Sequence, residues 1–521
     1  MSKWVALIGK ALAFTLMLAI PVLGTWCASS LAAYWNGSTA IAITAGALAF
    51  PVLPLLWEGW SERRRRVAQR ASDAPPKKRI LTFTDRLILR TLLLDGALLA
   101  ILFYSAPQAI FTALSTRGDW FLEGAEWAGG ARRVVLSVAD RMEWLYKLAY
   151  DNPYASEADE QPDPGPTPTA GSAIAQGGEG TTSDAGAPVR DLGPEAIAAD
   201  AGAHADGGVA RVEATPVEAP TPDVPTPTAP RARTWPFEQV VHPAVASIAA
   251  SDERSIDSVA TYLRAQADDP VDRAKAVHDY VATRVAYDVP ALHGRRPRQD
   301  VQTVFSTHAA VCEGYARLFV ALGRSAGLEA RYLVGDARDA DDPTGAEPHA
   351  WSAVRLDGGW YLVDATWDAG SVEGDTFTPR YSSMYFLTPP AVFGADHFPD
   401  DVVWQLRPDP LSRGEFQRRP VLGAGFVASG FHLESPDRAQ IDVDASSLDL
   451  RLTSDDRSFL LVSVLRHGAR GEAARCDSDG AGNLKVFCPI PSTGIFDVVF
   501  FAGAEQYGTH SSVGGIQVTR R

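Results

Sequence analysis

The sequence lacks an excess of basic residues, which limits the partners it can bind. Its 48 lysines and arginines are outnumbered by 63 aspartates and glutamates, and the formal net charge is −15 at pH 7. Nucleic-acid binding needs a basic surface that displaces counterions from the phosphates. We therefore expect no nucleic-acid partner, and the arginine clusters need another explanation.

Charge is almost absent from three apolar stretches near the N-terminus. These are residues 5–24, 40–57 and 92–111. Their only charged side chains are Lys10 and Asp95. Each stretch is close to the ~20 residues that cross the hydrocarbon core of a bilayer. Residues 1–111 are therefore predicted to form a region of three transmembrane helices.

Arginine and lysine are dense between the second and third stretches, from Arg63 to Arg90. By the positive-inside rule this loop is cytoplasmic, so the N-terminus is inside and everything after Phe111 is extracytoplasmic. A localisation or nucleic-acid tag would explain the same arginines, but the apolar flanks favour the membrane interpretation. A second alternative makes the first stretch a cleaved signal peptide, although no clean cleavage site precedes Trp26. The expected location is the cell membrane, with several crossings.

Cysteine is scarce, with only Cys27, Cys312, Cys476 and Cys488 in the chain. This usage fits an oxidising compartment, and the close pair Cys476 and Cys488 is predicted to form a disulfide. Cys27 lies at a membrane edge. Cys312 is then an unpaired thiol outside the membrane, which suggests a reactive role, although a buried, inert cysteine is the general explanation for a lone thiol.

Aromatic residues are almost missing from residues 151–235, which are rich in Pro, Ala, Gly and Thr. Such a segment cannot bury enough apolar area to offset its chain entropy, so we expect a disordered linker. As a coil it would hold the next domain about 50 Å from its anchor. Before it, apolar residues from Val134 to Leu148 recur at helical spacing and predict one amphipathic juxtamembrane helix within residues 112–150.

Regular periodicity returns after the linker, in residues 236–410. The predicted helices are residues 255–266, residues 270–287 and a third that begins near Cys312 and ends before Gly327. The predicted strands are residues 331–335, 349–356 and 360–367. Residues 357–359 have the composition of a hairpin turn between the last two. One α+β domain is therefore expected here.

The last part of the chain, residues 411–521, alternates short apolar runs with polar turns. The runs are residues 440–443, 448–453, 459–465 and 495–501. This pattern predicts an all-β sandwich.

Three residues of the α+β domain have the chemistry of a nucleophile, a base and an orienting group. A thiol reacts as thiolate, which a helix N-terminus and a neighbouring imidazole stabilise, and Cys312 begins a predicted helix. If the hairpin loop is Asp357 and Gly358 alone, His349 and Asp364 are diagonal neighbours on one face, ~7–8 Å apart at their Cα atoms. A three-residue loop would place them on opposite faces.

Three short motifs resemble the transglutaminase-like core, which is implied to have a papain-like thiol fold. They are VCEGYARLF at residues 311–319, HAW at residues 349–351 and WYLVDATWD at residues 360–368. The flanks, at residues 276–288 and 385–406, are similar to the kyphoscoliosis peptidase and cytokinesis branch of that superfamily. The resemblance implies a catalytic triad of Cys312, His349 and Asp364 in this chain order, with β-sandwich material behind the core.

Other polar residues carry weaker signals. Gln299 and Gln302 precede the nucleophile, and an upstream glutamine can help to bind the oxyanion in papain-like sites. Gln302 and Trp351 are candidate substrate-binding residues, although a surface glutamine and a tryptophan packed on the sheet are simpler explanations. His308 and His397 are expected to be structural. No metal or other cofactor is expected, because the acidic run at residues 336–342 lacks calcium-loop spacing and suits a solvated loop.

These features predict acyl transfer by a membrane-anchored cysteine enzyme. Cys312 would attack a carboxamide or peptide carbonyl to form a thioester, and His349 would protonate the leaving amine. Resolution by water would make the protein a peptidase or deamidase, and resolution by an amine a transglutaminase. The expected partners are the membrane and protein or peptide substrates of the cell envelope. The alternative is an inactive scaffold that binds an envelope partner.

The topology can be tested with compartment-specific reporters fused after Arg70 and after Arg233. Because the basic loop is held in the cytoplasm, we expect a cytoplasmic signal at Arg70 and an extracytoplasmic signal at Arg233. Equal signals at the two positions would contradict the predicted orientation.

Overall fold

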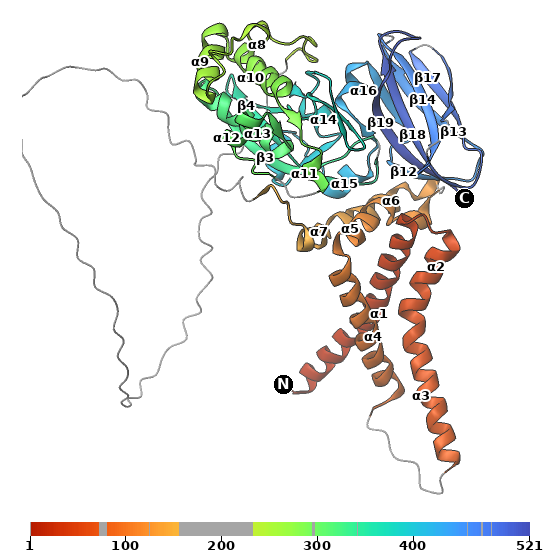
Figure 1. The fold of residues 1–521 in the computed structure, drawn as a ribbon. Coiled ribbons are helices and arrows are strands. Elements are labelled where there is room, and N and C mark those ends of the chain that lie inside the picture. The colour runs from red at the N-terminus through yellow and green to blue at the C-terminus, as the bar shows by residue number, and fades with distance from the viewer. Residues whose placement is uncertain are drawn as a thin grey trace, which may run out of the picture. The chain divides into compact units, whose positions relative to one another are not determined.

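The computed structural model describes residues 2–71, 81–123, 126–155, 233–293, 297–340, 342–455, 457–469, 473–480 and 482–521. Most of the predicted linker lies outside these residues. The N-terminal part is helical, the middle part combines a five-stranded sheet with helices, and the C-terminal part is built of strands (Figure 1). A mixed α+β protein with a β-rich C-terminal region is thus confirmed.

The N-terminal helices are α1 (Ser2–Tyr34), α2 (Thr39–Ala47), the π-helix η1 (Leu48–Val52), α3 (Leu53–Arg70), α4 (Phe83–Ser105) and α5 (Pro107–Arg117). Two of the three predicted crossings lie on helices that are long and apolar enough to span a membrane by length and composition, Ile8–Tyr34 and Phe83–Ser105. The middle stretch is divided among α2, η1 and α3, and Pro51 lies in η1. The third ends at Ser105, before Phe111, because Pro107 disfavours helical backbone at Ala106.

The prediction of a single amphipathic helix after the membrane region is wrong. The chain forms the short elements η2 (Trp120–Leu122), η3 (Glu126–Ala128), α6 (Gly129–Asp140) and α7 (Glu143–Ala149). The last two are separated at Arg141 and Met142. Leu136 and Leu145 are buried, but Val134 and Leu148 are exposed. The apolar stripe therefore does not form one continuous buried face.

The two described ends of the predicted linker, residues 151–155 and 233–235, contact the middle domain. Near the first end, the hydroxyl of Tyr332 donates a 3.3 Å hydrogen bond to the carbonyl of Tyr154. Near the second, the indole of Trp235 donates a 3.2 Å hydrogen bond to the carbonyl of Met384. The expectation that the linker sets the distance between anchor and domain is therefore wrong, because Tyr154, on the N-terminal side of the undescribed residues, already contacts the domain.

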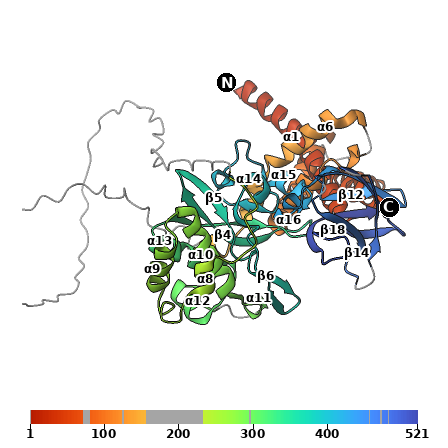
Figure 2. The same cartoon turned by 90° about the horizontal axis from the view of Figure 1, so that it is seen from above.

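The middle domain consists of one five-stranded sheet and the helices around it. Its helices are α8 (Pro243–Ser247), α9 (Ile256–Gln266), α10 (Pro270–Arg284), α11 (Pro290–His293), α12 (Val301–Thr307), α13 (Cys312–Ser325), α14 (Pro390–Phe393) and η5 (Val402–Gln405). The sheet has the order β8 (Phe386–Thr388), β5 (Gly359–Val363), β4 (Glu347–Leu356), β3 (Glu329–Ala337) and β9 (His397–Pro399). Helices α9, α10 and α13 lie together in both views, and α13 packs on β3 and β4 (Figures 1 and 2).

Two small strand pairs complete this domain. The parallel pair is β1 (Ala286–Tyr287) with β2 (Ala309–Ala310), and the antiparallel pair is β6 (Gly370–Glu373) with β7 (Thr376–Pro379). The helix predicted to run to Tyr287 ends at Arg284, because Ala286 and Tyr287 pair with β2 instead. Gly327, the predicted terminator of α13, has a φ of 85°, which glycine adopts without strain.

The hairpin between β4 and β5 has the two-residue loop on which the predicted triad depends. Leu356 pairs with Gly359, and the register continues without a shift to Ser352 opposite Val363. The loop residues Asp357 and Gly358 have φ values of 51° and 80°, as a type I′ turn requires. The two-residue loop is thus confirmed.

The C-terminal strands form two sheets. The strands are β10 (Val421–Leu422), β11 (Phe431–Ser435), β12 (Gln440–Val443), β13 (Ser447–Ser454), β14 (Phe459–Arg466), β15 (Ala474–Arg475), β16 (Asp477–Asp479), β17 (Asn483–Pro489), β18 (Gly494–Gly503) and β19 (Ser511–Arg520), with helices α15 (Arg413–Arg418) and α16 (Ala424–Ala428). One sheet has the order β10-β19-β18-β14-β15, with β12 also on β19, and the other β11-β13-β17-β16. Leu450 and Val486 of one sheet share a hydrophobic cluster with Val498 and Ile516 of the other, as in a sandwich.

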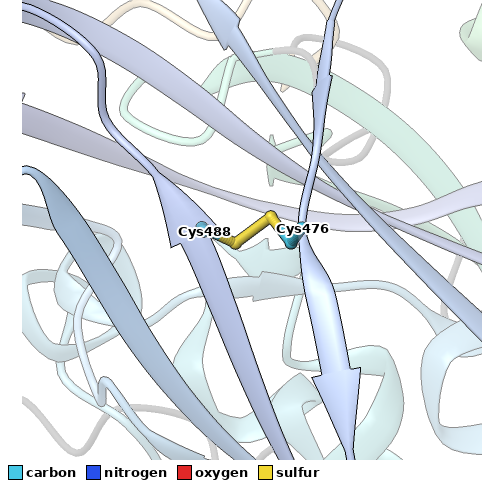
Figure 3. The surroundings of a disulfide bond; sticks show 2 residues. All are labelled: Cys476 and Cys488. Atoms are coloured by element: carbon cyan, nitrogen blue, oxygen red, sulfur yellow. A yellow bond between two sulfur atoms is a disulfide. The ribbon is translucent and has the colours of Figure 1, made fainter.

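A disulfide joins Cys476 to Cys488, the pair that the sequence singles out (Figure 3). It connects the segment between β15 and β16 to β17. Among the described residues the free cysteines are Cys27 and Cys312, and both are buried.

Arg413, at the start of α15, links three parts of the chain. Its buried side chain forms an ion pair with Asp336 of β3, which is also buried. The guanidinium lies 4.5 Å from the ring centroid of Tyr146 in α7 and 4.6 Å from that of Phe398 in β9. The hydroxyl of Tyr146 donates a 3.2 Å hydrogen bond to Asp336. Asp336 is therefore part of a buried network, and its assignment to a solvated acidic loop is wrong.

Replacing Arg413 should destabilise the fold strongly. Arg413→Met leaves Asp336 as an unpaired buried charge, which costs about 3–5 kcal/mol of unfolding free energy. Adding Asp336→Asn should recover part of this loss. Denaturant unfolding of the full chain in detergent, followed by tryptophan fluorescence, measures both variants.

The matched control is Arg419→Met, which removes a nearby pair with Glu415 whose side chains are 44% and 39% exposed. It should change the unfolding free energy by under about 1 kcal/mol. If Arg413→Met were as mild as this control, the ion pair with Asp336 would have no stabilising role.

Candidate active site

Cys312 is the first residue of α13, where the predicted nucleophile is expected. The N–H groups in the first turn of a helix have no acceptor within that helix, so they present partial positive charge to a group at its N-terminus. The preceding residue, Val311, donates its N–H to Oε1 of the buried Gln299 at 3.0 Å, and Nε2 of Gln299 donates to the carbonyl of Pro297 at 3.1 Å. Gln299 thus braces the segment that enters α13.

His349 and Asp364 form a direct hydrogen bond. Their Nε2 and Oδ2 atoms are 2.7 Å apart. The other carboxylate oxygen, Oδ1, accepts the N–H groups of Thr366 at 2.8 Å and Trp367 at 3.3 Å. Because the bond to Asp364 uses Nε2, Nδ1 is the ring nitrogen of His349 that remains for another partner. The Cys312 side chain is one of the groups that raise the pKa of His349.

The face on which this pair lies follows from the hairpin register. Trp351 and Ala353 of β4 pack in the same hydrophobic cluster as Trp360 and Leu362 of β5. Odd-numbered residues of β4 and even-numbered residues of β5 therefore share one face. His349 belongs to the first set, and Asp364 continues the second just beyond the end of β5 at Val363.

The three side chains are almost fully buried, with exposed fractions of 2% for Cys312, 8% for His349 and 1% for Asp364. Burial disfavours the charged imidazole, but Asp364 and Cys312 outweigh it and raise the pKa of His349 to about 10. Burial also disfavours the carboxylate, yet His349 and His397 outweigh it and hold the pKa of Asp364 well below its usual range. The pair is therefore an imidazolium and a carboxylate at neutral pH.

A second histidine, His397, also contacts the carboxylate of Asp364. Its Nε2 is 3.2 Å from Oδ2 of Asp364, and its Nδ1 is 2.6 Å from Oδ1 of Asp396. The hydroxyl of Tyr385 donates to the other oxygen of Asp396 at 2.5 Å. Sequence reasoning missed this role of His397, although a carboxylate next to a histidine, as in Asp396 and His397, is the available signal.

Two histidines and a carboxylate are also the ligands that several metal ions prefer. One donor atom each from His349, Asp364 and His397 lies within 4.8 Å of the other two. These are the residues of the described chain that could hold an ion. The hydrogen bonds of both histidines to Asp364 already explain why these three donor atoms lie so close together.

The two candidate substrate-binding residues lie in different surroundings. The ring of Trp351 is 6.1 Å from that of His349 at an interplanar angle of 27°, and this tryptophan is 1% exposed. It therefore packs beside the imidazole within the domain. Gln302 is exposed on α12. The hydrogen bonds of the described residues join Gln299, rather than Gln302, to the start of α13.

Comparison with known proteins matches residues 257–365 to the transglutaminase-like superfamily. The chain is 32% identical over 262 residues to kyphoscoliosis peptidase of Mus musculus, a match of 49% of this chain and 39% of that protein. It is 24% identical over 254 residues to hillarin of Drosophila melanogaster, a match of 43% of this chain and 30% of that protein. A solved structure, "Crystal structure of a TGase", matches 27% of this chain and 39% of its own at 21% identity, with a TM-score of 0.19. The resemblance seen in the motifs is thus confirmed, and the chain matches less than half the length of these relatives.

The pair of His349 and Asp364 should stabilise the fold at neutral pH and lose this effect at high pH. The pKa of His349 is raised from 6.5 to about 10, so the stabilisation is complete below about 6.5 and is lost as the pH rises through about 10. The loss of unfolding free energy caused by His349→Gln should therefore shrink between about pH 7 and about pH 11.

The control is the same substitution made in an Asp364→Asn background. Asp364 is the larger of the two groups that raise the pKa of His349, so without its carboxylate the effect of His349→Gln should lose most of this pH dependence. The same pH dependence in both backgrounds would show that Asp364 is not the partner of the charged ring.

Proposed function

We propose that this chain, which contains a domain of the transglutaminase-like superfamily, is a membrane-anchored thiol acyltransferase or peptidase. Cys312 is the nucleophile, His349 the general base and acid, and Asp364 the group that orients the imidazole. The observation that carries the proposal is the 2.7 Å bond between His349 and Asp364, on the ring whose other nitrogen remains for Cys312. This is the arrangement of a nucleophile, a base and an orienting group.

The reaction has two half-steps. The Cys312 thiolate attacks the carbonyl carbon of an amide and forms a C–S bond, and the N–H groups at the start of α13 stabilise the oxyanion. The C–N bond then breaks, and His349 gives its proton to the leaving amine, which leaves a thioester. In the second half-step His349 removes a proton from water, and the oxygen attacks the thioester. The C–S bond then breaks, which releases the carboxylic acid and leaves the Cys312 thiolate beside the protonated His349.

An amine in place of water would turn the second half-step into transamidation. The relative from Mus musculus is named a peptidase, which favours water as the acceptor. Hydrolysis of protein or peptide amides is therefore the first reaction to test.

The proposed location is the extracytoplasmic face of the cell membrane. Helices α1 and α4 are long and apolar enough to form the anchor. The basic run from Arg63 to Arg90 favours a cytoplasmic loop between the crossings. Exposed apolar residues near the anchor, such as Trp127 and Val134, suit the membrane interface. Envelope proteins and peptides are the substrates that this location offers.

A binding scaffold is the second candidate, and the burial of Cys312 favours it. A thiol that is 2% exposed reacts only if the site opens. The rate of alkylation by iodoacetamide near neutral pH separates the two functions, with Cys27→Ala as the background that removes the other free thiol. Fast labelling supports the enzyme, and a thiol as slow as an ordinary buried cysteine supports the scaffold.

The triad should act as one unit. Cys312→Ala and His349→Ala should each abolish thioester formation with acyl donors captured from envelope extracts, while the chain stays folded. Asp364→Asn should leave a rate reduced on the order of 10⁴-fold, because the base loses its orienting charge. The double variant His349→Ala/Asp364→Asn should be no worse than His349→Ala, since losses within one unit are not additive.

Cys27→Ala is the matched control and should retain full activity, because Cys27 lies in α1. A folded His349→Ala variant with wild-type turnover would exclude the proposed base. If the wild type forms no thioester with any donor, while partner binding survives Cys312→Ala, the scaffold replaces the enzyme.

A further inference from the structure

We propose that His397 is a positioning residue for the catalytic pair, because it binds the same carboxylate oxygen of Asp364 that accepts the hydrogen bond of His349. This inference rests on the proposed function, in which Asp364 orients His349. The Nε2 atoms of both histidines lie on one oxygen of Asp364, at 2.7 Å for His349 and 3.2 Å for His397. His397 itself does not need to touch the substrate or Cys312.

The carboxylate of Asp364 is saturated with donors. An ionised carboxylate has about four lone-pair sites. The backbone N–H groups of Thr366 and Trp367 take two of them at Oδ1, and the rings of His349 and His397 take two at Oδ2. Removal of His397 leaves a buried acceptor site empty and frees one oxygen to move with the ring of His349. An orienting group that can move no longer fixes its base.

His397 is itself held firmly. Its second nitrogen is bonded to Asp396 at 2.6 Å, and Asp396 accepts the hydroxyl of Tyr385 at 2.5 Å. The ring centroid of His397 lies 4.1 Å from that of Phe393 and 4.5 Å from that of Trp367. Hydrogen bonds in the ring plane and aromatic contacts together fix the ring. Asp396, just before β9, thus fixes the ring of His397, and that ring in turn holds Asp364.

The carboxylates beside His397 favour its charged form. Both of its ring nitrogens lie within hydrogen-bond distance of carboxylate oxygens, and the imidazolium can donate to both. Burial opposes this form, but Asp396 and Asp364 outweigh it and raise the pKa of His397. The titratable groups around the ring are Asp364 after β5, Asp396 before β9, His349 on β4 and Tyr385 before β8. Removal of this ring should therefore raise the pH at which Cys312 becomes reactive.

The same chain contains a matched arrangement away from the carboxylate of Asp364. His278 in α10 lies between Asp279 at 2.8 Å and Asp368 at 3.1 Å, and all three are fully buried. Its pKa is raised to about 9, since the two carboxylates outweigh its burial. His278→Gln removes a buried imidazole from between two carboxylates, as His397→Gln does, but keeps the four donors of Asp364. Comparison of the two variants therefore distinguishes a positioning role of His397 from a merely structural one.

The experiment uses the full chain in detergent with Cys27→Ala as background. Iodoacetamide reports the pH dependence of Cys312 alkylation, p-nitrophenyl acetate reports the rate of Cys312 acylation, and thermal unfolding reports stability. For His397→Gln we expect the alkylation midpoint to rise by about one pH unit. Acylation should slow on the order of 100-fold, as a misplaced catalytic group does. His278→Gln should lower the unfolding temperature as much as His397→Gln does, but its alkylation midpoint should equal that of the parent protein.

Two further variants keep the proposal testable. Tyr385→Phe removes the donor to Asp396 at the far end of the chain of contacts, together with the acceptor of the Ala424 N–H, so it should shift the alkylation midpoint in the same direction by less. His397→Gln/Asp396→Asn removes the second carboxylate with the histidine. If it restores the parent acylation rate, His397 serves only to neutralise Asp396 and the positioning role is excluded.

The positioning role is also overturned if folded His397→Gln and Tyr385→Phe keep the parent midpoint and acylation rate, or if His278→Gln shifts them equally. These results leave the proposed function intact. By contrast, a parent protein in which neither probe reacts at Cys312 would refute the thiol enzyme itself, and the positioning role with it.

Discussion

The backbone at Asp357 and Gly358 fixes the register of the hairpin that carries the candidate site. Both residues adopt a positive φ, which closes β4 and β5 with two residues and no bulge. A loop longer by one residue would turn Asp364 to the opposite face of the sheet from His349. The 2.7 Å bond between these two side chains therefore depends on a turn distant from the chemistry.

Three groups of buried, paired charges stand out among the described residues. Two are histidines between carboxylates, at His278 and His397, and the third is the ion pair of Arg413 with Asp336. Buried pairs of this kind add little net stability, but removal of one partner is costly. These groups fix how the segments pack. Each group joins segments that are distant in sequence, and few other arrangements of those segments would pair its charges.

The contacts on either side of the linker change its interpretation. Tyr154 and Trp235, at its two described ends, both bond to the middle domain, so the linker does not set the distance of that domain from the N-terminal helices. Arg413 joins the same parts of the chain, because it pairs with Asp336 of β3 and its guanidinium lies over the ring of Tyr146 in α7.

Local patterns in the sequence were sufficient for the helices, the hairpin, the disulfide pair and the three triad candidates. Apolar spacing, a glycine turn and short motifs act over a few residues, and the structure follows them at Cys312 and at Leu356 opposite Gly359. The early end of α10 and the burial of Asp336 were decided by partners distant in sequence, β2 and Arg413. The same holds for His397, which meets Asp364 only because β9 pairs with β3 beside β4. Such contacts depend on which strands become neighbours, and no short-range pattern records that.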